Sequence, residues 1–82
     1  MDNRELSEQV GAELRKRGQD GFRMLYLEKP EDMAGVGVEM HVGEVMYRNA
    51  WRTYQCGVPE IADKAAEWMD SVRAAPEKYR AA

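Results

Sequence analysis

Cysteine and histidine are almost absent from this chain. Cys56 and His41 are the only residues of their types among 82, so no disulfide can form within the chain and a zinc site of Cys and His ligands is excluded. A catalytic Cys–His pair must lie within hydrogen-bond reach. In the strand pairing derived below, His41 lies opposite Met46, and Cys56 is roughly 33 Å further along a straight strand. We therefore expect Cys56 to be a small hydrophobe and neither residue to be catalytic.

Several other signatures are also missing. No segment approaches the ~20 apolar residues of a membrane span, and the first residues, MDNRELSEQ, lack the basic and apolar regions of a signal peptide. Residues 28–32 lack calcium-loop spacing, and residues 34–37 (AGVG) lack the G-x-G-x-x-G order of a phosphate-binding loop. These absences predict a cytoplasmic protein without a membrane segment, metal or cofactor.

The chain is too short to bury a large core. We expect the 82 residues to form a single domain, 1–82, and a domain of this size buries roughly 60% of its unfolded surface. Self-association, for example as a homodimer, would add to that buried area. The formal charge of −3 is too acidic for general nucleic-acid binding and too mild for a nucleic-acid mimic.

Residues 36–53 (VGVEMHVGEVMYRNAWRT) carry the clearest structural pattern. Their two halves alternate with period two around Gly43-Glu44, and a two-residue loop with glycine first is typical of a type II′ hairpin turn. That turn places Glu39 opposite Arg48 as a favourable cross-strand pair of charges. The same register pairs Val42 with Val45, Met40 with Tyr47, and Val36 with Trp51.

Residues 45–56 also fit a helix. Several side chains recur there at helical spacing, and Gly57 followed by Pro59 would end a helix. Aromatic and β-branched residues in the same stretch, together with the coherent pairing to 36–42, favour a strand. We expect a strand over 45–54 and keep the helix as the alternative.

Amphipathic patterns on both sides of the hairpin predict two helices. A stripe of Leu6, Val10 and Leu14 marks a helix over 4–17, and a broad apolar face behind Pro59 marks one over 59–75. Residues 22–28 (FRMLYLE) have the composition of a strand. The expected fold is therefore α+β: a two-layer α-β-β-β-α domain whose three-stranded antiparallel sheet has both helices on one face.

One face of this sheet is expected to pack against the helices. The strand residues on it are Met24, Tyr26, Val38, Met40, Val45, Tyr47 and Trp51. Trp68 and Met69 of the second helix are expected to pack against this face, together with Leu6, Val10 and Leu14 of the first. Gly11 in the first helix either permits close approach to the sheet or is tolerated at a cost of about 1 kcal/mol in helix propensity.

The opposite face is expected to stay uncovered and to bind a partner. Alternation places Glu39, His41 and three arginines on it among apolar residues, and arginine and tyrosine are typical anchors of protein interfaces. The candidate partner-binding residues are Arg23, Leu25, Met46, Arg48, Arg52 and Tyr54. The alternative is an ordinary solvated face with a Glu39–Arg48 pair.

No nucleophile or acid–base pair is placed by any spacing in the chain, so we expect no enzyme. The favoured function is a small interaction module, regulatory or inhibitory in the manner of phage and mobile-element proteins, that binds a protein partner or itself. The alternative is nucleic-acid binding by an Arg/aromatic sheet surface. The element order resembles that of double-stranded RNA-binding domains, but the basic cluster those domains place at the start of their last helix is absent, since residues 58–66 read VPEIADKAA.

Overall fold

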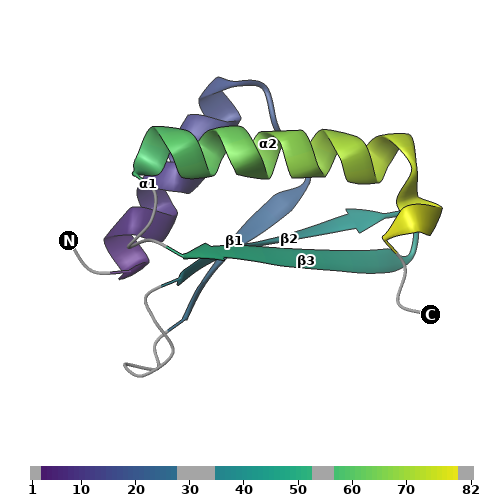
Figure 1. The fold of residues 1–82 in the computed structure, drawn as a ribbon, viewed down its shortest axis with the longest axis horizontal. Helices are drawn as coiled ribbons and strands as arrows, with labels where there is room; N and C mark the ends of the chain where they lie inside the picture. Colours follow the sequence, from purple (N-terminus) through teal and green to yellow (C-terminus); the bar gives the residue numbers. More distant parts are fainter. Residues whose placement is uncertain (1–2, 28–34, 53–56, 80–82) are drawn as a thin grey trace.

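The described part of the chain folds into two long helices and a three-stranded sheet (Figure 1). The computed structural model describes residues 3–27, 35–52 and 57–79. Along the chain, the elements are α1 (Asn3–Lys16), β1 (Phe22–Leu27), β2 (Gly35–Val42), β3 (Val45–Arg52), α2 (Val58–Ala74) and a short 3-10 helix, η2 (Pro76–Lys78). The expected α+β class and element order are confirmed, and each long helix starts and ends one residue earlier than expected.

The strands form one antiparallel sheet in the order β1-β2-β3. The register of β2 and β3 is the expected one, with Val42 opposite Val45 and Glu39 opposite Arg48. Gly43 begins the connecting turn with φ +63°, the left-handed conformation that a primed hairpin turn requires there. Residues 45–52 are therefore strand rather than helix, and the expected continuation to residue 54 lies outside the described residues.

Both helices pack against the same face of the sheet, so the domain is two layers thick (Figure 1). The hydrophobic core lies between the two layers, and full burial of one aliphatic side chain there stabilises the fold by about 1.5–3 kcal/mol. Most core residues come from alternate positions of β2 and from the apolar stripe of each helix. The buried core consists of Val10, Leu14, Val36, Val38, Met40, Tyr47, Ile61, Ala62, Ala65, Met69 and Val72.

Gly11 allows α1 to lie directly against β1. Gly11 is buried, and a Cβ atom at this position would come within 2.8 Å of Cγ of Met24, which is closer than non-bonded carbon atoms pack. One turn earlier on α1, Ser7 donates a hydrogen bond to the carbonyl oxygen of Leu25 at 3.4 Å. The glycine therefore serves close approach, the first of the two interpretations offered by the sequence.

Trp68 packs against the covered face of the sheet as expected, but its ring is not fully buried. Its indole is partly buried and packs edge-on against Trp51 of β3, with ring centroids 5.9 Å apart and ring planes at 73°. The two helices do not approach the three strands equally. Helix α1 lies closest to β1 and β2, and α2 lies closest to β2. On the outer strand β3, Tyr47 is buried, whereas Val45 and Trp51 are only partly buried, as is Met24 on β1. The side chain of Tyr26 lies outside the described part of the chain.

A polar cluster ties the turn between α1 and β1 to the last part of α2. Arg73 donates hydrogen bonds to the side-chain oxygen of Gln19 and to the carbonyl oxygen of Asp20. Gln19 in turn donates a hydrogen bond to Asp70 at 3.0 Å. These contacts hold the start of β1 against the helix layer.

Candidate interaction surface

The sheet face turned away from the helices is the candidate site, and we call it the arginine face (Figure 1). Alternate residues of each strand point to it, and none of the described helices covers it. Its described residues are Arg23 and Leu25 of β1, Gly35, Gly37, Glu39 and His41 of β2, and Met46, Arg48, Ala50 and Arg52 of β3.

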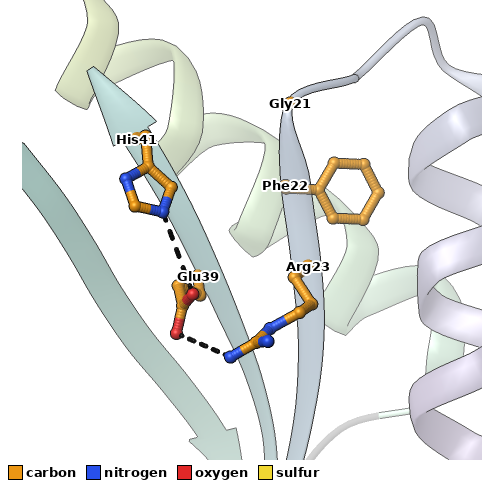
Figure 2. A pocket seen from close by; sticks show the side chains of 5 residues that line it. All are labelled: Gly21, Phe22, Arg23, Glu39 and His41. Atoms are coloured by element: carbon orange, nitrogen blue, oxygen red, sulfur yellow. Dashed lines mark hydrogen bonds and ion pairs between the residues drawn. The ribbon is translucent and has the colours of Figure 1, made fainter. Parts of the chain in front are cut away.

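Side chains from all three strands converge on the carboxylate of Glu39. Arg23, Glu39 and Arg48 occupy one cross-strand row. Nε of Arg48 donates a hydrogen bond to Oε2 of Glu39 at 2.9 Å, and Nη2 of Arg23 donates to the same oxygen at 3.3 Å. His41, two residues along β2, has its Nε2 3.9 Å from Oε1 (Figure 2).

Glu39 is buried although it lies on the uncovered face. Only 8% of its side chain is exposed, against 69% for Arg23 and 60% for Arg48, because the two long side chains lie over it and keep their outer surfaces in water. Burial raises the pKa of Glu39, but the hydrogen bond from Arg48 and the charges of both arginines outweigh it, and the pKa is lowered from its ordinary value. Glu39 is therefore an ionised centre that orients two guanidinium groups.

The structure places five of the six predicted partner-binding residues on this one face. Four of them are exposed: Arg23, Met46, Arg48 and Arg52. Leu25 is half-buried because it leans over Gly37, where a Cβ atom would lie 3.3 Å from Cβ of Leu25. The sixth residue, Tyr54, lies outside the described residues.

Sequence reasoning misses that Glu39 is the centre of the cluster. The hairpin register pairs Glu39 with Arg48, but the contact with Arg23 depends on how β1 pairs with β2, and no short turn of known geometry joins those strands. A weaker signal was available, because Arg23 is the only charged residue of β1 and Glu39 the only acid of β2. Opposite charges on one sheet face favour a register that pairs them.

A shallow hollow of about 330 Å³ lies beside the cluster, lined by Gly21, Phe22, Arg23, Glu39 and His41. Figure 2 shows Arg23, Glu39 and His41 grouped together, while the ring of Phe22 points to the other side of β1. The hollow is open to solvent, and three of its five lining residues have polar side chains. It therefore lacks the enclosed apolar walls of a typical small-molecule site.

Charge is distributed unevenly between the two layers. The three strands carry three arginines and one glutamate, a net +2, whereas α2 carries four acids and two bases, a net −2. The whole chain has a formal charge of −3. The arginine face is thus a positive surface on an acidic protein.

Within residues 3–27, 35–52 and 57–79, no three His, Cys, Asp or Glu side chains gather as metal ligands do. None of the helices in those ranges has the length and apolar character needed to cross a membrane. Each buried side-chain nitrogen or oxygen atom there has a hydrogen-bond partner, so no orphaned polar group points to a missing ligand.

Comparison with protein-family models, with curated proteins and with solved structures finds no match to this chain. The geometry and charge of the arginine face are therefore the basis for inferring a function.

Proposed function

We propose that this protein is a small non-enzymatic interaction module that binds a protein partner through the arginine face. The observation that supports the proposal is the cluster around Glu39, where two exposed guanidinium groups are held over one ionised carboxylate. Arginine is enriched among the residues that dominate binding energy at protein interfaces. A regulatory or inhibitory role, of the kind that small phage and mobile-element proteins perform, is part of the proposal on grounds of size alone.

The cluster suits recognition because its arginines are oriented before a partner arrives. Immobilising a long side chain at an interface costs about 0.5–1.5 kcal/mol, and the contacts with Glu39 reduce that loss in advance. Met46, opposite His41 on the same face, is 44% exposed and adds flexible apolar surface that adapts to a partner. Charged and apolar contacts are therefore available side by side.

The same cluster is poorly suited to catalysis. A general acid or base needs a pKa near the working pH and a free position for proton transfer. Glu39 has a lowered pKa, and its carboxylate accepts hydrogen bonds from two guanidinium groups. We therefore propose a binding role for Glu39 and not proton transfer.

Nucleic-acid binding is the second candidate, because the arginine face is positively charged. Single-stranded nucleic acids are bound by basic grooves in which bases stack on aromatic side chains. Among the described residues of the face, His41 is the only ring. The positive charge favours this candidate and the shortage of stacking surface weakens it.

Charge reversal on the arginine face tests the proposal. We expect the wild-type chain to retain a protein partner from a lysate of its source cells, identified by quantitative mass spectrometry, and we expect Arg48→Glu and Met46→Glu to lose it. The matched control is Arg4→Glu, the same charge reversal at an α1 side chain that is 73% exposed, which should retain the partner. Circular dichroism and thermal unfolding establish that each variant is folded.

Equal retention of the partner by all three folded variants would contradict the proposal. If Arg4→Glu loses the partner and Arg48→Glu retains it, the interface lies on the helix layer instead. Retention that disappears after nuclease treatment would assign the arginine face to nucleic acid.

A further inference from the structure

We propose that the arginine face recognises an acidic segment of its protein partner, and that a carboxylate of that segment bridges Arg23 and Arg48. This inference rests on the proposed interaction function and names the chemistry of the partner. Its basis is the position of the two guanidinium groups, the distribution of charge and the apolar residues beside them.

The first step concerns geometry. Nη2 of Arg23 and Nε of Arg48 donate to the same oxygen of Glu39, at 3.3 Å and 2.9 Å. The two nitrogens therefore lie no more than about 6 Å apart, which is short enough for one carboxylate to contact both guanidinium groups. Both side chains keep more than half of their surface exposed, at 69% and 60%.

The second step concerns charge. One carboxylate cannot neutralise two guanidinium groups, so the row of Arg23, Glu39 and Arg48 keeps an excess positive charge. Arg52 lies on the same face, whereas acids predominate on α2 in the other layer. A surface of this kind attracts and orients a partner that carries negative charge.

The third step concerns the neighbouring side chains. Leu25 lies one row from the arginines on β1, and Met46 lies beside Arg48 on the His41 side. Leu25 is half-buried and Met46 is 44% exposed, so each offers apolar contact next to the charged row. The face therefore fits a segment in which acidic and apolar side chains are interspersed.

Two other occupants fit less well. A nucleic acid would find little surface for base stacking, because His41 is the only ring among the described residues of the face. A second copy that docked through the same face would set guanidinium groups against guanidinium groups. A copy that docked its acidic α2 would make a head-to-tail contact, which tends toward open-ended chains instead of a closed pair.

The test uses the full-length ¹⁵N-labelled chain and three soluble probes. These are a blocked peptide of alternating glutamate and serine, the same peptide with glutamine in place of glutamate, and an oligothymidylate of equal length. We expect the glutamate peptide to shift the amide signals of Arg23, Glu39 and Arg48 at low ionic strength, and to leave those of α2 unchanged. Added salt should weaken the binding, and the glutamine peptide should shift none of these signals.

Matched variants assign the effect to the two arginines. We expect Arg23→Gln and Arg48→Gln each to weaken binding of the glutamate peptide roughly three- to tenfold, as loss of one exposed ion pair implies. Arg4→Gln on α1 removes the same charge from a side chain that is 73% exposed and should leave the affinity within about twofold.

Several results overturn the inference. The inference is wrong if the glutamate peptide shifts no amide signals. It is also wrong if Arg4→Gln weakens binding of the peptide as much as Arg23→Gln and Arg48→Gln do, because the attraction would then depend on overall charge and not on a site. Tighter binding of the oligothymidylate to the same residues would replace the acidic segment with phosphate. If a partner is lost with Arg48→Glu while the glutamate peptide shifts nothing, the interaction function stands and the acidic segment is wrong. If the capture experiment also fails, both proposals fall.

Discussion

At the scale of single residues, Glu39 is the most informative position. A strand residue on an uncovered sheet face is ordinarily solvated, yet only 8% of the Glu39 side chain is exposed beside the two arginines. Removal of one partner from a buried pair leaves the other charge poorly solvated. Glu39 therefore links the stability of the sheet to the chemistry of the face.

Acidification should reveal this link. Folding lowers the pKa of Glu39 below its ordinary value of 4.5, so its contribution to stability is fully present above that value and is lost as the pH falls through the folded-state pKa. We expect Glu39→Gln to lower the urea midpoint of unfolding at pH ~7. The difference in midpoint between the variant and the wild type should become smaller at pH ~3. The control is Glu8→Gln, whose side chain is 72% exposed and should change little at either pH. A gap of constant size would show that ionisation of Glu39 does not stabilise the fold.

At the scale of elements, the hairpin of β2 and β3 depends on one turn residue. Gly43 has φ +63°, where an L side chain crowds the following carbonyl group and costs about 1–2 kcal/mol. The turn determines which residues of β2 face β3, because a slip by one position would move each side chain to the other face of the sheet.

Substitution in the turn tests this dependence. We expect Gly43→Ala to destabilise the fold by about 1–2 kcal/mol in urea unfolding, and Gly43→Asn to cost less because asparagine tolerates left-handed conformations. Glu44→Ala, at the neighbouring exposed position, should stay within about 0.5 kcal/mol of wild type. Equal effects of the two alanine substitutions would mean that backbone conformation at Gly43 is not the cause.

At the scale of the whole molecule, the inward residues of the sheet are buried most completely on the central strand. On β2 the inward residues Val36, Val38 and Met40 are fully buried, whereas on β3 Tyr47 is buried and Val45 and Trp51 are only partly buried. Adjacent residues of α2 show the same difference, because Met69 is 0% exposed while Trp68 is only partly buried against Trp51.

Two alanine substitutions in α2 test whether this difference in burial appears in stability. Met69→Ala should destabilise the fold by about 2–5 kcal/mol, the range for removing a buried large side chain. Trp68→Ala should cost less than Met69→Ala, because the indole leaves a partly solvated site and loses an edge-on aromatic contact of about 0.5–1.5 kcal/mol. Urea unfolding followed by circular dichroism gives both values. A larger loss of unfolding free energy for Trp68→Ala than for Met69→Ala would show that the contact of Trp68 with β3 is part of the main core.

Much of the fold was predictable because its signals are local. Apolar spacing marks both helices, and Gly43-Glu44 with the flanking alternation sets the register of β2 and β3. Five of the six candidate partner-binding residues share a face for the same reason, since alternation along a strand decides which face a side chain takes. Local patterns could not show that Leu25 leans over Gly37 or that Trp68 lies at the margin of the helix layer.

The sequence by itself determined both helices, the hairpin turn and the face that each strand residue would take, because these follow from periods of two and 3.6 residues and from one turn. The structure decided that residues 45–52 are strand and not helix. Only the tertiary structure decided that Arg23 joins Arg48 on Glu39, since the pairing of β1 with β2 is not set by a short turn. It also decided how far two helices cover three strands. The physical reason is that both outcomes depend on contacts between segments distant in the chain, whose energies are settled by packing and not by local propensity.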